Sequence, residues 1–183
     1  MNTRIVERSI VHYTNKERRK RGMKALAGHR TLIRAARGHS RWMARHNRMS
    51  HTGGGGSEPW HRAKRAGYPS EYVGENLWQT SGRSGLAWKS KFRWRSDWKL
   101  GQAAVITWMN SPGHRQNLLK SDYKHIGIGV ARNKRGRIYL TQKFGYVPNV
   151  LATRSGNVSA SWLWWAICLT LLIALIGVCN SVG

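Results

Sequence analysis

An uncharged apolar run near the C-terminus divides this chain into two parts of opposite chemistry. Residues 162–179 include no charged side chain, and Trp162, Trp164 and Trp165 stand at the start of the run. A helix of this length is about 27 Å long, close to the ~30 Å hydrocarbon core of a bilayer, and tryptophan favours the lipid–water interface. The sequence therefore predicts one transmembrane helix over 162–179, reached through a polar linker over 148–161. A buried core helix is the alternative.

The part before this run is strongly basic. All 32 Lys and Arg residues lie at or before Arg154, against 7 Asp and Glu, so the formal net charge of +25 belongs to this part. Such a charge favours anionic partners such as nucleic acid, acidic lipid or another anionic polymer. Both cysteines, Cys168 and Cys179, lie in the apolar run, so a domain over 1–147 must be stabilised by packing and not by disulfides.

The two ends of the chain predict a membrane topology. Residues 1–22 contain scattered charges and no continuous apolar core, so no secretory signal peptide is predicted there. Residues 180–183, beyond the span, include no Lys or Arg. We expect a single-pass C-terminal anchor with the basic domain in the cytoplasm. An extracytoplasmic domain is the alternative, because the charge rule is weak for long domains.

Aromatic and basic side chains alternate over residues 88–98. The aromatic positions are Trp88, Phe92, Trp94 and Trp98, and the basic positions are Lys89, Lys91, Arg93 and Arg95. In an extended backbone the two kinds would occupy opposite faces. The basic face then suits an acidic membrane surface or single-stranded nucleic acid. The alternative is an edge segment whose aromatic face covers the core.

The stretch Trp108-Met109-Asn110-Ser111-Pro112-Gly113-His114-Arg115 predicts the end of one helix, a tight break and the start of another. Ser111 suits the N-cap and Pro112 the first helical position. His114 then lies in the first turn, where the positive end of the helix dipole disfavours the imidazolium. We expect a neutral His114 with a nitrogen lone pair available to a metal ion or a proton.

Periodicity and turn residues predict the remaining elements. Helices are expected over 4–21 and 31–48, with a short helix that is capped by Ser57 and ends at Arg65. His39 lies on the apolar stripe of the second helix, which favours a core role. Four glycines at 53–56 lack the phosphate-loop pattern, so no phosphate-binding loop is predicted.

Strands are expected over 73–78 and as a hairpin of 126–130 with 138–144. In the hairpin, Ile126, Ile128 and Val130 alternate with Gly127 and Gly129. One face of this strand is therefore bare, and another element can pack closely against it. Glu75, in the first strand, is costly to bury unless it is paired.

Six motifs follow one another along the chain. They are Asn15-x-x-Arg18 with Gly22 and Leu26, Ser50-His51-Thr52, Gly74-Glu75-Asn76, the helix-break stretch given above, Gly127-Ile128-Gly129-Val130, and Thr141-Gln142-Lys143-Phe144-Gly145. In this order they resemble prokaryotic CAP domains, which belong to the SCP or pathogenesis-related-1-like superfamily. The resemblance covers about residues 5–146. It implies an α/β fold class, an α-β-α sandwich with a small antiparallel sheet between helices.

The resemblance also implies a shared cleft. In the eukaryotic branch this cleft contains two histidines and two glutamates, and the histidines can bind a divalent metal ion, often zinc. Carried over by motif, the metal-binding or catalytic candidates are His51, Glu75 and His114. The second glutamate falls on Ser111, a departure that weakens a four-ligand site. Cleft support is expected from Asn76, Ser111, Arg115 and Gln142.

Three functions are compatible with this set of residues. The preferred one is a membrane-anchored CAP domain whose cleft binds a small ligand or a divalent metal, with water in an open fourth zinc position. The second is a metal-dependent hydrolase that uses the same residues. A Ser111, His114 and Glu75 triad is disfavoured, because the Ser111 hydroxyl is better explained as a helix cap. The third is a charge-driven binder of nucleic acid or anionic polymer.

Overall fold

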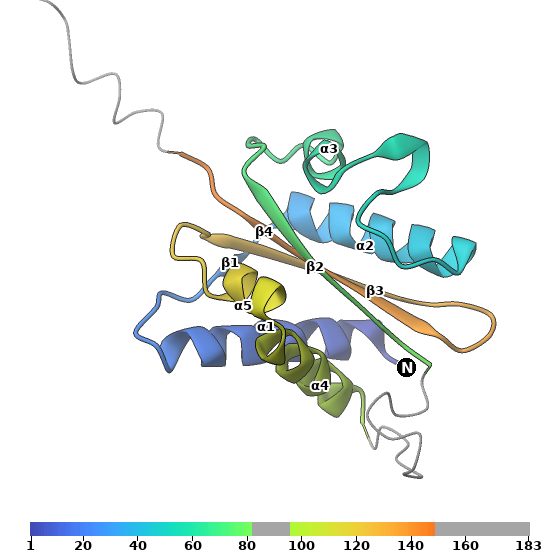
Figure 1. The fold of residues 1–183 in the computed structure, drawn as a ribbon, viewed down its shortest axis with the longest axis horizontal. Coiled ribbons are helices and arrows are strands. Elements are labelled where there is room, and N and C mark those ends of the chain that lie inside the picture. The colour runs from blue at the N-terminus through green and yellow to red at the C-terminus, as the bar shows by residue number, and fades with distance from the viewer. Residues whose placement is uncertain (82–95, 149–183) are drawn as a thin grey trace, which may run out of the picture. The chain divides into compact units, whose positions relative to one another are not determined.

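Helices cover both faces of a four-stranded sheet (Figure 1). This is a computed structural model, and it describes residues 1–81 and 96–148. Residues 1–147 form one compact unit. The predicted span at 162–179, most of its linker and the basic positions of the 88–98 segment lie outside the described residues. Within the described ranges, no helix is long and apolar enough to cross a membrane.

The sheet has the strand order β1-β3-β4-β2. β2 (Val73–Thr80), β4 (Ile138–Gly145) and β3 (His125–Arg132) are antiparallel neighbours, and β1 (Ala27–Gly28) runs parallel to β3. The expected antiparallel sheet is therefore correct for the three long strands and wrong for β1. Nothing in the local pattern predicts β1, because a strand of two residues has no periodicity.

The helices form two layers. α1 (Thr3–Arg19), α4 (Asp97–Asn110) and α5 (Pro112–Leu118) lie on one side of the sheet, and α2 (Arg30–His46) and α3 (Pro59–Arg65) lie on the other (Figure 1). A short 3-10 turn, η1 (Gly54–Gly56), lies between α2 and α3. The expected sandwich of helices around a sheet is therefore found in this unit.

Several helix ends differ from the sequence expectation. Glu58, and not Ser57, is the N-cap of α3, and its side chain and that of His61 form a reciprocal capping box. Trp98 lies in the first turn of α4, so the extended alternation expected over 88–98 does not reach its last residue. The Trp98 ring lies 5.4 Å from the ring of His12, on α1, between centroids.

Bare glycine positions allow α2 to pack directly on the backbone of β3. A Cβ atom at Gly127 would overlap the backbone of Leu32 and Ile33, and one at Gly129 would overlap the backbone of Ala36. The sequence expectation of a close approach at these glycines is confirmed. The contact also brings the buried Ser40 hydroxyl within 2.9 Å of the carbonyl oxygen of Gly129, to which it donates.

We expect Gly129→Val to lower the free energy of unfolding by about 3 kcal/mol or more, because the new side chain must displace α2 from the sheet. Urea unfolding followed by circular dichroism measures this loss. Gly38→Ala is the matched control, since Gly38 lies on the same helix with nothing within 4 Å of an added Cβ. It should be stabilising by about 0.5–1 kcal/mol. A Gly129→Val variant as stable as the native chain would contradict the close packing.

Candidate functional site

The carboxylate of Glu75 lies buried among cationic side chains. Its side chain is 1% exposed and accepts hydrogen bonds from His51 Nδ1 at 3.0 Å and from Lys143 Nζ at 2.8 Å. Arg62 Nη2 donates to both carboxylate oxygens, each at 3.0 Å. We call Glu75, Arg62, Lys143 and His51 the Glu75 cluster.

Four separate segments supply the Glu75 cluster. The register of the sheet places Glu75 on β2 directly opposite Lys143 on β4. Arg62 comes from α3, and His51 from the loop that follows α2. Arg62 Nη2 also donates to the backbone oxygen of His51 at 2.8 Å. The cluster therefore fixes the His51 loop against the sheet.

The cluster keeps Glu75 ionised. Burial raises the pKa of Glu75, but the hydrogen bond from His51 and the charges of Lys143 and Arg62 outweigh it, and the net pKa is lowered to about 2. Burial in turn lowers the pKa of Lys143, against the opposing effect of Glu75. Both oxygens of Glu75 already accept hydrogen bonds, so this carboxylate is poorly placed to serve as a metal ligand.

His39 is the core histidine that its position on the α2 stripe predicts. Its side chain is fully buried, with Nε2 at 2.8 Å from the backbone oxygen of Ser50. Burial lowers the pKa of His39 to about 4, with further lowering by Arg62 and Lys143 against the raising effect of Glu75. The ring is therefore neutral near pH 7. Because Nε2 must donate to the Ser50 carbonyl, Nδ1 is left as an acceptor.

His114 lies at the start of α5, with Nδ1 at 2.8 Å from Ser111 Oγ. Burial lowers its pKa, and the charge of His51 lowers it further. The expected preference for a neutral imidazole is thus supported, with burial and a neighbouring histidine as the causes of the lowered pKa. Ser111 is the N-cap residue, yet its hydroxyl makes no cap hydrogen bond and contacts the His114 ring. The interpretation of this hydroxyl as a cap is therefore wrong.

A network of side-chain amides connects β2 with the neighbouring strand β4 and with α1 and α5. Asn76 Nδ2 donates to the backbone oxygen of His114 at 3.1 Å and to Gln142 Oε1 at 3.2 Å. Gln142 Nε2 in turn donates to Thr14 Oγ1, on α1, at 2.9 Å. Asn117 Nδ2, on α5, donates to the backbone oxygen of Glu75 at 3.3 Å and to Asn76 Oδ1 at 2.9 Å. Asn76 and Asn117 therefore join α5 to the edge strand, and Gln142 connects Asn76 to α1.

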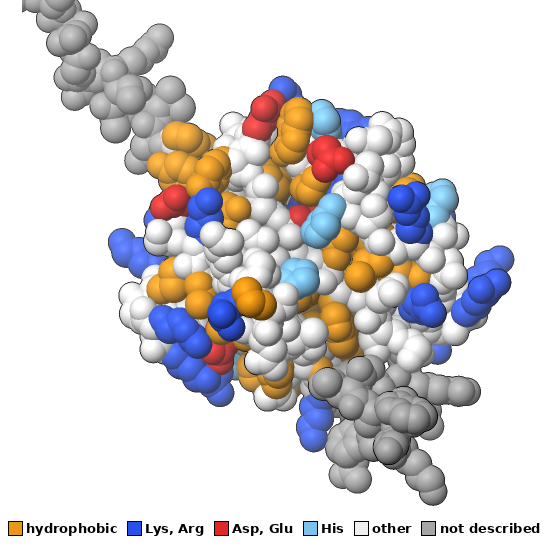
Figure 2. Space-filling model, in the orientation of Figure 1, with side chains coloured by type: hydrophobic (Ala, Val, Ile, Leu, Met, Phe, Trp, Pro, Cys, Tyr) orange, Lys and Arg blue, Asp and Glu red, His pale blue; other side chains and the backbone are white. Residues whose placement is uncertain are grey.

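The three predicted site residues lie in one neighbourhood. Glu75 is in direct contact with His51, and the neighbouring residue Asn76 donates to the backbone oxygen of His114. Figure 2 shows histidine side chains near the middle of the face drawn there. Within residues 1–81 and 96–148, no group of three or more His, Cys, Asp or Glu side chains is arranged to hold a metal ion. The neighbourhood therefore offers two histidines and an occupied carboxylate.

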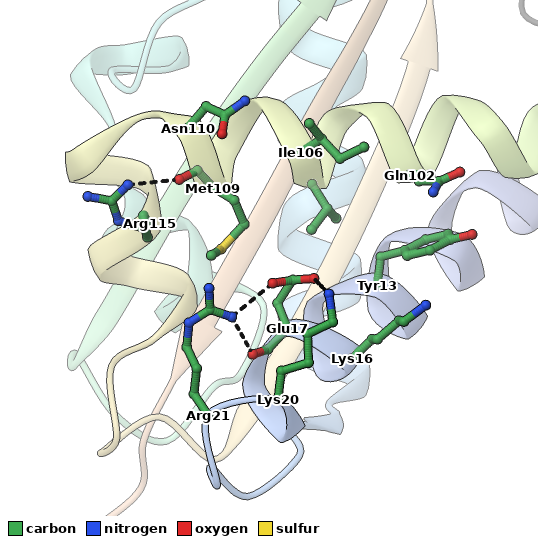
Figure 3. A pocket seen from close by; sticks show the side chains of 11 residues that line it. Tyr13, Lys16, Glu17, Lys20, Arg21, Gln102, Ile106, Met109, Asn110 and Arg115 are labelled. Carbon is green, nitrogen blue, oxygen red and sulfur yellow. Dashed lines mark hydrogen bonds and ion pairs between the residues drawn. The ribbon is translucent and has the colours of Figure 1, made fainter.

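Arg115 does not lie with these residues. It is exposed, donates from Nη1 to the backbone oxygen of Met109 at 3.1 Å, and lines a separate groove between α1 and α4 (Figure 3). In the same groove, Glu17 is paired with Lys20 and Arg21 (Figure 3). These contacts place the Arg115 side chain at the α1–α4 groove. The cleft-supporting role expected of Arg115 stays a prediction.

Two residues of the Glu75 cluster are absent from the sequence prediction. Arg62 and Lys143 carry the counter-charges, and neither was expected from the sequence as a partner of Glu75. A usable signal for Lys143 was its place in an otherwise uncharged strand, opposite the strand of Glu75 in an antiparallel pairing. Arg62 gives no comparable signal, because its contact depends on how α3 packs.

Comparison with known proteins gives a consistent result. Residues 11–144 match the family model CAP, described as the Cysteine-rich secretory protein family. The uncharacterized protein YkwD of Bacillus subtilis (strain 168) is 32% identical over 139 residues, which are 76% of this chain and 47% of that protein. The uncharacterized membrane protein YlbC of the same organism is 32% identical over 138 residues, 75% of this chain and 34% of that protein. This chain thus spans less than half the length of each relative.

Solved structures show the same architecture. An extracellular protein containing a SCP domain from Bacillus anthracis str. Ames has a TM-score of 0.62 and 26% identity, covering 79% of this chain and 41% of that one. An outer surface protein from Borrelia burgdorferi has a TM-score of 0.61 and 19% identity, covering 75% of this chain and 90% of that one. The second likeness concerns the fold alone.

We expect Glu75→Gln to lower the free energy of unfolding by about 3–5 kcal/mol, because Lys143 and Arg62 would remain buried without a counter-charge. Glu75→Gln combined with Lys143→Met should recover part of this loss. Urea unfolding at neutral pH measures both. Glu17→Gln is the control, since its ion pairs lie at the surface and should contribute at most about 1 kcal/mol.

The same variant has a pH signature. The pKa of Glu75 in the folded chain, about 2, lies below its ordinary value of 4.5, so its stabilisation is complete above pH 4.5 and is lost as the pH falls towards 2. The gap in stability between native chain and Glu75→Gln should therefore narrow over this interval. A gap that is constant from pH 7 to about pH 3 would contradict an ionised, charge-stabilised Glu75.

Proposed function

This chain belongs to the CAP family, and we propose that it is a membrane-anchored CAP domain whose cleft binds a divalent metal ion through His51 and His114. The observation that carries the proposal is that each ring has its Nδ1 engaged by an oxygen, Glu75 Oε1 for His51 and Ser111 Oγ for His114. A metal-binding histidine typically has its other ring nitrogen held in this way. The Nε2 atoms are then the ligands.

The donor set suits zinc in an open site. Two neutral imidazoles supply nitrogen ligands, and water or a bound molecule completes the coordination. In this proposal Glu75 is an orienting residue for His51 and not a ligand, because its oxygens accept from His51, Arg62 and Lys143. A two-histidine site is weaker than a site with three protein ligands, which leaves room for a small ligand to share the ion.

Hydrolysis is less well supported than binding. Ser111 and His114 are within hydrogen-bond distance, but the carboxylate that would orient the base is bonded to His51. The contacts described therefore do not form a catalytic triad, in which the carboxylate would have to bond to the same histidine as the serine. Metal-assisted hydrolysis remains the second candidate, since a metal held by His51 and His114 would activate water when bound.

The anchor and its orientation belong to the same proposal. The uncharged run 162–179, together with the basic residues before it, supports a single C-terminal span with the domain in the cytoplasm. The relative YlbC is described as a membrane protein, whereas the similar protein from Bacillus anthracis is described as extracellular. Binding of acidic lipid or nucleic acid by Lys89, Lys91, Arg93 and Arg95 stays a sequence prediction, because these residues lie outside the described ranges.

Zinc binding is expected to require both cleft histidines. Calorimetric titration of the full-length chain in detergent should show one Zn²⁺ ion bound per chain. The double variant His51→Ala/His114→Ala should lose this binding. Ser111→Ala removes the hydroxyl that contacts Nδ1 of His114, and it should lower the affinity for Zn²⁺ by about tenfold or more. Affinity should fall as the pH drops through the histidine range, because the ligands must be deprotonated.

His12→Ala is the matched control for zinc, since His12 is exposed on α1, where its ring lies near those of Tyr13 and Trp98. This variant should still bind one Zn²⁺ ion per chain. The metal proposal is wrong if the double variant binds Zn²⁺ with the same stoichiometry and affinity as the native chain.

Membrane anchoring is expected to depend on the centre of the apolar run. The native chain should remain with membranes after carbonate extraction, and Leu171→Arg/Leu172→Arg should release it, because each arginine costs about 2.5–3.5 kcal/mol at the centre of a span. The conservative pair Leu171→Ile/Leu172→Ile is the control. Protease added to intact cells should spare the domain if it is cytoplasmic, and loss of the domain would place it outside.

A further inference from the structure

A hollow between α2 and α3, on the face of the sheet away from α1 and α4, is lined by basic side chains. It has a volume of about 380 Å³. The basic residues that line it are Arg34, Arg45, Arg62, Arg65 and His39. The described residues that form its wall include no Asp or Glu. We call this hollow the arginine pocket.

Two buried polar atoms of the arginine pocket have no hydrogen-bond partner. They are His39 Nδ1 and Arg62 Nε. The His39 side chain is 0% exposed and that of Arg62 is 9% exposed. Buried polar groups are nearly always satisfied, so unpartnered atoms at the wall of a pocket indicate a ligand or a bound water.

The two atoms have opposite hydrogen-bonding character. His39 Nε2 lies 2.8 Å from the backbone oxygen of Ser50 and must carry the proton, so the Nδ1 of a neutral ring can only accept. Arg62 Nε can only donate, while its Nη2 is engaged by Glu75. Arg45 and Arg65 are exposed and make no ion pair among the described contacts. The pocket therefore offers one buried acceptor among several cationic donors.

The glycine loop brings the chain close to these atoms. A Cβ atom at Gly53 would lie 3.3 Å from His39 Nδ1 and 3.1 Å from Arg62 Nη1, and one at Gly54 would lie 3.0 Å from Trp42 Nε1. Glycine at these two positions keeps the loop from crowding the pocket wall. The loop has no phosphate-loop pattern, and the pocket depends instead on side chains of α2 and α3.

We propose that the arginine pocket binds a hydrogen phosphate group, whose P–OH donates to His39 Nδ1 and whose anionic oxygens accept from Arg62 Nε and the neighbouring guanidinium groups. Arginine forks match the oxygens of phosphate. Sulfate has the same shape but no proton near neutral pH, so it would turn an anionic oxygen towards the lone pair of Nδ1. This site shares Arg62 with the Glu75 cluster, but it does not rest on the proposed metal.

The first test compares ligands on the full-length chain in detergent, by calorimetry in a chloride buffer. Inorganic phosphate should bind saturably and at least tenfold more tightly than sulfate. Glycerol phosphate is titrated near pH 6, where a phosphate monoester retains a proton. Its comparison with inorganic phosphate distinguishes a site for free phosphate from a site for the phosphate end of a larger molecule. Equal binding of sulfate and phosphate, or no saturable binding because water alone fills the pocket, would overturn the proposal.

The second test compares variants of equal charge. Arg45→Gln/Arg65→Gln should lower the affinity for phosphate at least tenfold. Arg4→Gln/Arg8→Gln removes the same charge from exposed positions on α1, in the helix layer on the other face of the sheet. It should leave the affinity for phosphate within about twofold, because distant exposed charges are screened. An equal loss of phosphate affinity in both double variants would mean that overall charge controls binding, and it would contradict the proposed site.

A spectroscopic readout locates the ligand. The ¹⁵N signal of His39 Nδ1 should shift on addition of phosphate, with a smaller shift for sulfate, because the proposed hydrogen bond forms at that atom. This measurement needs no substitution in the core. An unchanged Nδ1 signal at saturating phosphate would place the anion elsewhere and contradict the proposal.

Discussion

The buried charge on Glu75 is the interaction on which the geometry of the cleft depends. A buried carboxylate without partners would be strongly destabilising, and here Lys143 and Arg62 supply two cations within hydrogen-bond distance. Their contacts join β2, β4, α3 and the loop that carries His51. A chain with 32 basic and only 7 acidic residues thus uses one of its few acids where it orders four segments at once.

Alternation along β2 explains how one strand serves both layers of helices. Successive side chains of a strand point to opposite faces, so Glu75 and Asn76 face different layers. Glu75 meets Arg62 of α3 on one side, and Asn76 meets the backbone of His114 on α5 on the other. Because β2 lies at the edge of the sheet, the contacts that Glu75 and Asn76 make on its two faces both lie at this edge.

Close packing on the far side of the sheet supports the arginine pocket. The bare glycines of β3 let α2 lie against the sheet, where His39 is fully buried and its Nδ1 has no hydrogen-bond partner. Arg62 belongs to both features, since its Nη2 donates to Glu75 and the residue also lines the pocket. The cleft and the pocket therefore share one arginine.

The sequence by itself determined the elements with a local signature. Helical periodicity predicted α1 and α2 to within a few residues, the glycine alternation predicted the close approach at β3, and ordered motifs predicted the family. These succeed because each depends on neighbouring residues or on a motif that can be recognised without coordinates.

Only the tertiary structure decided which groups satisfy one another. The counter-ions of Glu75, the contact of the Ser111 hydroxyl with His114, the parallel pairing of β1 and the outward position of Arg115 all depend on register and helix packing across long stretches of chain. Local pattern cannot rank 32 basic residues as partners for one acid, because any of them satisfies the same charge rule. The distance between two side chains is fixed only when the strands are paired and the helices are docked.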